Sequence, residues 1–557
     1  MNTTSLAPLN PAALAPPGRR NVLDDAHVGD IHGALGTLRQ HDALPRSRRR
    51  RLLALLAIMG PGLIVMVGDN DAGGIATYAQ AGQNYGLTLL WTLLLLIPVL
   101  IVNQEMVVRL GAVTGVGHAR LIIERFGKFW GAFSVGDLFI LNFLTIVTEF
   151  IGVSLALGYF GVSKYLSVPI AAGLLIAMTM TGSFRRWERF MYVFVAMNFV
   201  AIPLALVSHP HLSPIVSHAL NPGVAGGFNS TSMLVIIAIV GTTVAPWQLF
   251  FQQSNVIDKR ITPRWINYER ADTVIGSVVV IIGAAALMIA AAFAFGATHL
   301  AGQFVDAGTV ATGLAHTLGP AAGALFAVAL LNAAIIGAAA VTLASSYAFG
   351  DVFRRPHSLH HGVSQARLFH GSYATTVILA AGIVLIPGAP LGTITTAVQA
   401  LAGVLLPSAT VFLLLLCNDK AVLGPWTNPT WLNALASAIV GVLVILSAIL
   451  TATTLFPSLD VTTLSEVLFG ALGLGLAAAG AYAWAGRRGP SGPLDRPAGF
   501  RAPPGADRAL WTMPRLELLE RPVWSRTRTI GMYTLRGYLV VAVLMLIVKA
   551  IEVGIGH

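Results

Sequence analysis

Two acidic residues lie between glycines in the middle of an apolar stretch near the start of the chain, in the segment Gly68-Asp69-Asn70-Asp71-Ala72-Gly73-Gly74. If the stretch crosses a bilayer, each carboxylate costs roughly 2.5–3.5 kcal/mol, so acids there usually mark a functional site. Glycine lets the backbone unwind, and unwound backbone at that depth persists only where it lines a cavity or is buried in protein. We therefore predict a broken helix, with Asp71 as a cation ligand and Asp69 as a nearby group of the pathway.

A second interruption lies in a later apolar run, in the segment Gly241-Thr242-Thr243-Val244-Ala245-Pro246-Trp247-Gln248. Proline lacks an N–H and frees a carbonyl about one turn earlier. The carbonyls of Gly68 and Thr242 are therefore further candidate ligands. The amide of Gln248 is another, although it could equally face protein. One such residue in a membrane helix usually marks a kink, but two matching breaks, one of them acidic, favour a site.

The composition of the chain indicates a membrane protein. Of its 557 residues 55% are hydrophobic and 11% charged, whereas soluble domains average about 25% charged residues. The net charge of +11 would suit a soluble nucleic-acid-binding protein, but here the basic residues cluster in particular loops. The lipid bilayer is therefore the expected partner, and nucleic acid is not. The single cysteine, Cys417, excludes an intramolecular disulfide.

Twelve apolar runs are long enough to cross a membrane at roughly 20 residues each, and the two interruptions fall in the first and the sixth. A thirteenth run, 533–553, either spans the bilayer or lies on its surface. The twelve runs cover 52–81, 88–110, 131–159, 167–183, 187–207, 231–257, 273–296, 320–349, 370–387, 391–416, 430–454 and 463–486.

Lysine and arginine alternate between the loops, which predicts the orientation. One set of loops, near 84–87, 208–230, 297–319, 387–391 and 455–462, carries no lysine or arginine. Lys164, between the third and fourth runs, is the only exception on that side. The other loops are basic. We expect a multi-pass protein of the cell inner (plasma) membrane with a cytoplasmic N-terminus.

Five spans per unit, with the first of each interrupted, indicates an inverted-repeat transporter with its site near the membrane midplane. We expect an all-α polytopic protein. Its parts are a basic, disordered cytoplasmic tail (1–50), a first five-helix repeat (51–207), an extracytoplasmic loop (208–230), a second five-helix repeat (231–416), helices 11 and 12 (417–486), a basic cytoplasmic linker (487–531) and a possible thirteenth helix (532–557).

Several motifs between about residues 50 and 425 resemble the Nramp divalent-metal transporters. This resemblance implies a LeuT-like fold, with spans 1–5 and 6–10 as inverted repeats. The motifs are Gly60-Pro61-Gly62, Asp71-Ala72-Gly73-Gly74, Ala76-Thr77 with Gln80-Ala81-Gly82 and Tyr85-Gly86, Arg109-Leu110-Gly111 with Val113-Thr114-Gly115, Glu149 with Ile151-Gly152, Gly241 with Pro246 and Leu249-Phe250, Gln399 with Pro407, and Asp419-Lys420 with Gly424.

The departures from the family pattern are informative. The family has Asp-Pro-Gly-Asn where this chain has Asp71 to Gly74, so its asparagine ligand is replaced by Gly74. It has Met-Pro-His where this chain has Ala245-Pro246-Trp247, so a soft thioether and a proton-linked histidine are missing. Of the acids in the family's third helix, Glu149 remains. Ala245, Trp247 and Gly74 are expected to shape the pocket.

These losses resemble the Nramp-related magnesium transporters, a branch that carries Mg²⁺ and Mn²⁺ without proton coupling. Mg²⁺ prefers oxygen ligands, keeps several waters and is usually held by one or two carboxylates. The resemblance adds Gln399 as an amide ligand, although it could instead bond between helices. Glu149 belongs either to the pathway or to a structural pair. His357, His360 and His361 lie beside arginines, and we favour a structural role for them over a regulatory metal site.

We predict a transporter that imports divalent cations, most consistent with Mg²⁺ and also Mn²⁺, as partly hydrated ions by alternating access without proton coupling. The metal is the substrate, and no cofactor is expected. A proton-coupled Mn²⁺/Fe²⁺ transporter and a non-transporting membrane sensor or scaffold are the alternatives. We expect no enzyme, since the chain has neither a P-loop nor an evident nucleophile–base pair. The sequence leaves the oligomeric state open, with a monomer as the expectation.

Overall fold

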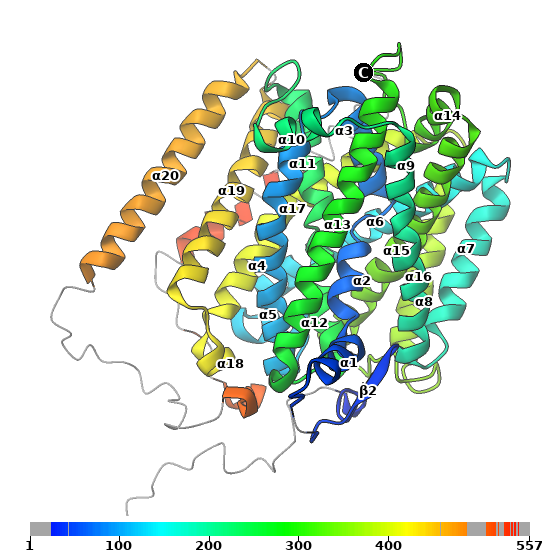
Figure 1. Ribbon diagram of the computed structural model, residues 1–557. Coiled ribbons are helices and arrows are strands. Elements are labelled where there is room, and N and C mark those ends of the chain that lie inside the picture. The colour runs from blue at the N-terminus through cyan, green and yellow to red at the C-terminus, as the bar shows by residue number, and fades with distance from the viewer. Residues whose placement is uncertain are drawn as a thin grey trace, which may run out of the picture.

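The computed structural model describes residues 24–42, 44–456, 458–486, 508–519, 522, 529–534, 536–537, 540–541 and 544. Figure 1 shows a bundle of helices with α1 (Arg48–Ile58), the strand β2 (Gly36–Leu38) and α18 (Lys420–Leu423) at its lower end. This end is called the N-terminal side below. The opposite side carries α3 (Ala72–Tyr85), α10 (Leu212–Leu220) and α14 (Ala307–Leu318).

Both five-helix repeats are present in the order that the sequence predicts. The remaining helices of the first are α2 (Pro61–Val67), α4 (Leu90–Thr114), α5 (His118–Phe126), α6 (Lys128–Tyr159), α7 (Lys164–Thr179), α8 (Phe184–Met197), η3 (Asn198–Val200) and α9 (Ala201–Val207). Those of the second are α11 (Ser230–Thr243), α12 (Pro246–Asp258), η4 (Pro263–Trp265), α13 (Ile266–Phe295), α15 (Pro320–Phe353), α16 (Arg367–Val384) and α17 (Leu391–Cys417).

After the second repeat the described chain continues with two long helices at the edge of the bundle. These are α19 (Thr430–Leu455) and α20 (Val461–Gly486), and Figure 1 shows α20 as the outermost helix. One short element precedes α19 in the chain, η5 (Gly424–Trp426). Two more follow α20, η6 (Arg508–Leu510) and η7 (Leu516–Leu518). The predicted helix at 533–553 falls mostly on residues that the structure does not describe.

Each of the twelve predicted apolar runs coincides with helix. Among the described residues, nine helices are long and apolar enough to cross a membrane, and ten if α1 and α2 are counted as one bent span. The first span is broken between α2 and α3 and the sixth between α11 and α12, as the glycines and Pro246 predict. The first span also bends by 55° between α1 and α2. These observations match the predicted polytopic all-α fold with two inverted repeats.

The centre of the bundle is built from long helices of both repeats. Helix α15 packs along α6, α13 packs along α3, and α11 packs along α17. Glycines allow the closest of these approaches. A Cβ atom at Gly241 would lie 2.2 Å from the backbone nitrogen of Gly403 and 2.4 Å from the carbonyl oxygen of Gln399. The backbones of α11 and α17 therefore touch beside the second break.

The N-terminal segment differs from the disordered tail predicted for residues 1–50. From Asp24 onward it forms the short helix η2 (Asp25–His27) and an antiparallel hairpin of β1 (Ile31–Gly33) and β2, with Ile31 paired to Leu38. His27 and Ile31 are buried. The segment is ordered because it packs on helix ends that are distant in sequence, and a polar composition does not reveal such contacts. Residues 1–23 lie outside the described part.

Part of the predicted linker 487–531 also packs on the bundle. Trp511 and Met513 are buried, and the backbone nitrogen of Met513 donates a hydrogen bond to the carbonyl of Val113, at 3.2 Å. The indole of Trp426 donates to the carbonyl of Arg508, at 2.9 Å. Residues 508–519 therefore cover the N-terminal side near the end of α4.

Candidate functional site

Asp71 lies at the gap between the two halves of the first broken span. It is the N-cap residue of α3, where its carboxylate accepts a hydrogen bond from the backbone nitrogen of Gly74 at 2.6 Å. A carboxylate at this position is stabilised by the free N–H groups and the dipole of the helix. The side chain is 2% exposed and contacts the side chains of Glu149 and Thr242. All of these contacting side chains offer oxygen.

Glu149 brings a second carboxylate to the same gap from α6. It is fully buried and accepts a hydrogen bond from the backbone nitrogen of Ala72 at 3.0 Å. The absence of a side chain at Gly337 makes the room: a Cβ atom there would lie 2.6 Å from Oε2 of Glu149 and 2.8 Å from Cβ of Asp71. The structure therefore pairs Asp71 with Glu149 and places α15 directly behind them.

The amide of Gln399 reaches the broken helix from α17. Its Nε2 atom lies 1.6 Å from where a Cβ atom of Gly73 would be, so the amide rests on the bare backbone of that glycine. Within the described part of the chain Nε2 has no hydrogen-bond partner. A buried amide donor without a partner is costly, so a hydrogen-bond acceptor is missing beside this nitrogen, whereas only the amide oxygen of Gln399 could ligate a cation.

The second break supplies Thr242 from α11. Its side-chain oxygen lies 3.0 Å from the Cβ position at Gly74. Its carbonyl would bond the N–H of residue 246 in a continuous helix, but Pro246 has none and instead begins α12. Thr242 therefore brings a hydroxyl and a freed carbonyl toward Asp71, and the small Gly74 leaves space between them.

Asp69 and Gln248 are paired with each other. The amide nitrogen of Gln248 donates to Oδ1 of Asp69 and, at 3.3 Å, to the carbonyl of Thr243. Its amide oxygen accepts from Gln104 of α4 at 2.8 Å. Asp69 is fully buried. The amide of Gln248 thus takes part in a chain of hydrogen bonds from Gln104 of α4 to Asp69. To ligate a metal ion, its oxygen would have to give up or share its bond with Gln104.

The residues that replace the family's methionine and histidine are buried at the start of α12. Ala245 is its N-cap residue. Trp247 is fully buried and packs edge-on against Phe251 with ring centroids 5.8 Å apart. Its ring lies 3.4 Å from the Cβ position at Gly68, so it closes over the end of α2, where the predicted carbonyl ligand lies. The indole forms part of the wall around the break.

Three residues that the sequence did not single out belong to the surroundings of the site. Gln104 anchors Gln248, Gly337 makes room for the carboxylate pair, and Tyr78 bonds Thr243 of the second break at 2.8 Å. A glutamine inside an apolar span is a detectable signal. Gly337 and Tyr78 carry no such signal, because their importance depends on the helix that faces them.

A cavity lies next to the site and is lined by Ala72 and Thr148, the sequence neighbours of Asp71 and Glu149, and by Asp306. Asp306 marks its outer end, because α14 lies on the opposite side of the bundle (Figure 1). Asp306 is the N-cap residue of α14 and accepts from the backbone of Thr309 at 2.7 Å. A Cβ atom at Gly392 would lie 2.1 Å from the carbonyl of Val305, so the loop before α14 presses on α17 and narrows the outer end.

The donor set is unlike a conventional metal cluster. Across the described ranges, no group of three or more His, Cys, Asp or Glu side chains has the arrangement of a metal site. The gap instead offers two carboxylates, a hydroxyl, an amide and freed carbonyls.

The histidines after α15 each bond a different partner: His357 bonds Asp351 at 3.2 Å, His361 bonds Asp24 at 2.8 Å, and His360 bonds the carbonyl of Asp258 at 3.1 Å.

Comparison with known proteins gives a consistent result. The family model described as natural resistance-associated macrophage protein-like (Nramp) matches residues 62–453. A divalent metal cation transporter MntH of Burkholderia ambifaria is 28% identical over 443 residues, which is 75% of this chain and 95% of that protein. A divalent metal cation transporter MntH of Staphylococcus aureus is 27% identical over 428 residues, 71% of this chain and 90% of that protein.

Solved structures support the same fold. A manganese transporter of Eremococcus coleocola, in complex with an aromatic bis-isothiourea compound, aligns with a TM-score of 0.59 at 21% identity, and covers 79% of this chain and 96% of that one. A mutant of the same transporter aligns with a TM-score of 0.60 and covers 80% and 96%. The predicted family resemblance and fold class are thereby confirmed.

Proposed function

The chain belongs to the Nramp family, and from this premise we propose that it imports Mg²⁺, and also Mn²⁺, as partly hydrated ions without proton coupling. It is a divalent metal cation transporter, and its relatives are transporters rather than enzymes. The metal is the substrate. The finer choice of ion rests on the groups that surround Asp71.

The observation that carries the proposal is the oxygen-rich gap around Asp71. Glu149 and Thr242 contact its carboxylate, and Ala245 takes the place of the family's soft thioether. A hard ion with oxygen ligands suits this set, and Mg²⁺ commonly keeps several waters beside one or two carboxylates. Gly74 and Ala245 are small enough to leave space for that water. Asp71, Gln399 and the carbonyls of Gly68 and Thr242 are the ligands that we propose.

The proposed path runs through the cavity from Asp306 to Asp71, and then past α2 to the N-terminal side. Asp69 and Glu149 lie along it. The arginine-rich loops support a cytoplasmic location for the N-terminal side and an inner-membrane location for the protein. We propose a single chain as the transporting unit.

A proton-coupled manganese transporter is the second candidate, since a structurally similar protein is a manganese transporter. Reconstitution in liposomes separates the two. We expect Mg²⁺ influx without accompanying proton influx, and we expect Asp71→Ala to abolish it. Proton influx in step with the metal, or uptake of Mn²⁺ without Mg²⁺, would favour the second candidate.

A further inference from the structure

Hydrogen bonds hold the start of α2, in the first half of the first broken span, against α13. The carboxylate of Asp272 on α13 accepts hydrogen bonds from the backbone nitrogens of Gly60 at 2.9 Å, Gly62 at 2.7 Å and Leu63 at 3.2 Å. Three bonds to one carboxylate fix the start of α2. If the ion is to leave on this side, as the proposed function requires, α1 and α2 have to move away from α13.

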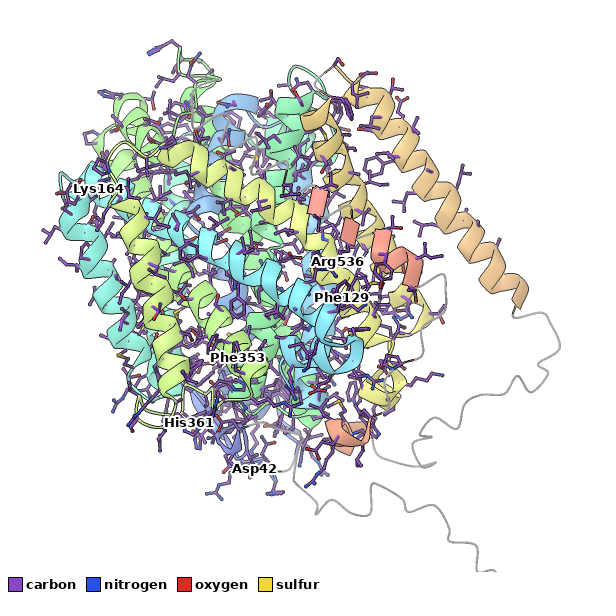
Figure 2. The ribbon with its side chains drawn as sticks, turned by 180° about the vertical axis from the view of Figure 1, so that it is seen from behind. Asp42, Phe129, Lys164, Phe353, His361 and Arg536 are labelled. Carbon is purple, nitrogen blue, oxygen red and sulfur yellow. The ribbon has the colours of Figure 1, made fainter. Side chains whose placement is uncertain are left out.

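A strap, defined as residues 24–42, packs on α1 through its two strands. Figure 2 shows Asp42 and His361 at the same end of the molecule, with Lys164 at the other. The strap touches α1 through two glycines. A Cβ atom at Gly33 would lie 2.1 Å from the carbonyl oxygen of Ala57, and one at Gly36 would lie 3.0 Å from Cβ of Ala57. Ile31, the first residue of β1, is fully buried.

One end of the strap is fastened to the loop that follows α15. The carboxylate of Asp24 accepts from the backbone nitrogen of His357 at 3.0 Å and pairs with Nε2 of His361 at 2.8 Å. Burial alone would raise the pKa of Asp24, but hydrogen bonds from Ala26 and His361 outweigh it and hold the pKa below the usual value. Asp24 is therefore a charged anchor across the physiological range.

The rest of the strap is fastened to α8 and to the turn after α12. The backbone nitrogen of Ala34 donates to Glu188 of α8. Arg260 donates to the carbonyl of Ala26 at 2.8 Å, and its own carbonyl accepts from Gln40 at 2.7 Å. Arg264 donates to the carbonyl of Gln40 at 3.1 Å. These bonds tie the strap to elements of both repeats, and the strap packs on α1.

We propose that the strap is a releasable latch, which must leave α1 before α1 and α2 can swing away from α13 and let the ion out. The inference rests on the proposed function for its purpose, but its structural content can be tested without transport. A strap that is bonded at both ends and packed on α1 through two glycines opposes the displacement of α1 that opening needs.

His27 makes the latch sensitive to protons. Its Nε2 lies 3.5 Å from Asp258 of α12 and its ring meets the ring of His357, with Asp24 of the strap and Asp351 of α15 nearby. Burial is the main cause that lowers the pKa of His27 to about 4. Burial also disfavours charge on His357, but the bonded Asp351 outweighs it and raises the pKa of His357. Because charge is favoured on His357, the repulsion between the two rings favours a neutral His27.

The sign of the pH effect follows from these values. A released His27 returns to an ordinary pKa of about 6.5. Because the docked pKa is the lower one, the contribution of His27 to docking is complete above pH 6.5 and is lost as the pH falls toward 4. Between pH 7.5 and 5.5 the released form gains about tenfold in relative population through this group.

Hydrogen exchange of the full-length protein, measured over residues 48–67, tests the latch. Gly33→Ala puts a methyl group against the carbonyl of Ala57 and should raise exchange in this segment at least severalfold. Thr37→Ala, on the exposed face of the same hairpin, is the matched control and should leave exchange unchanged. If Gly33→Ala protein does not fold, Asp24→Ala serves instead, because it removes one fastening and leaves α1 untouched.

The pH dependence of the latch is tested by the same hydrogen-exchange measurement. Lowering the pH from 7.5 to 5.5, after correction for intrinsic exchange, should raise exchange over residues 48–67 about tenfold in the wild type and much less in His27→Gln. Unchanged exchange in both Gly33→Ala and Asp24→Ala, or equal pH responses of wild type and His27→Gln, would overturn the latch. Absence of Mg²⁺ uptake by the wild type would instead contradict the proposed function and leave the exchange result standing.

Discussion

The carboxylate of Glu149 accepts a hydrogen bond from the backbone nitrogen of Ala72, the residue that follows Asp71. One acid thus fixes the backbone next to the other, and the two side chains touch. Two buried carboxylates in contact can both stay charged only when a cation lies between them. The pair is therefore better suited to hold a divalent cation than either acid alone.

We expect Glu149→Gln to lower the apparent affinity for Mg²⁺ at least tenfold. Glutamine still accepts from Ala72, so the backbone stays in place while one charge is lost. A charge at about 4 Å contributes roughly 4 kcal/mol at an effective dielectric constant of 20, and about 1.4 kcal/mol is tenfold in affinity. The Mg²⁺ dependence of liposome influx measures the effect. Glu466→Gln, on the exposed part of α20, is the control, and equal affinities in the two variants would contradict the prediction.

Gly73→Ala should displace Gln399 and reduce uptake at low Mg²⁺ about tenfold, because the new Cβ atom would occupy the place of the amide. Gly136→Ala is the matched control in a membrane helix, since nothing lies within 4 Å of its Cβ position. Initial rates of ²⁸Mg or fluorescent-indicator influx serve as the measurement. If Gly73→Ala transports like Gly136→Ala, Gln399 has no role in binding.

Ala245→Met should shift the preference of the transporter toward Mn²⁺. A thioether is a softer ligand than oxygen or water and favours the transition metal. We expect the ratio of Mn²⁺ to Mg²⁺ uptake, measured in competition, to rise severalfold. Ala245→Leu has a similar bulk without sulfur and separates crowding from ligation. An identical ratio in the two variants would show that residue 245 does not face the ion.

Asp306→Asn should weaken the capture of Mg²⁺ from the outer side while leaving the maximal rate nearly unchanged. Asparagine caps a helix as well as aspartate does, so α14 keeps its start and only the charge at the outer end of the cavity is lost. Asp460→Asn makes the same change at another exposed helix start, where the carboxylate bonds Thr462 and Thr463. A several-fold rise in KM for Asp306→Asn, shrinking at high salt and absent in Asp460→Asn, is the expected result.

Lys259→Met should destabilise the protein by about 3–5 kcal/mol, the usual effect of removing one partner of a buried ion pair. Lys259 and Glu188 are both fully buried and bonded to each other, and Lys259 also donates to the carbonyl of Met59. Thermal unfolding in detergent measures the loss. The double variant Lys259→Met with Glu188→Gln removes both charges and should recover much of it. No recovery would indicate that the bond to Met59 is the larger contribution.

Much of the fold was predictable because its signals are local. Glycines around Asp71 and the proline at 246 break helices wherever they occur, and the apolar runs fix the order of the spans. The two breaks also pointed to Asp71 and Thr242, whereas Gln399 came only from the family resemblance. The pairing of Gln248 with Asp69 was not predictable, since it depends on which side of α12 faces α2. The strap escaped prediction for the same reason, because its polar residues are ordered only by partners in α8, α12 and the loop after α15.

The fastening of Asp24 to His357 also constrains how the protein is made. These two residues are 333 positions apart in the chain, and domains and their parts are generally assembled as the chain emerges from the ribosome. The strap is synthesised early. It can take its final place only after the eighth span and the loop that follows it have been made. Docking of the strap is accordingly a late event of biogenesis, and a chain truncated before residue 357 lacks the partner that completes it.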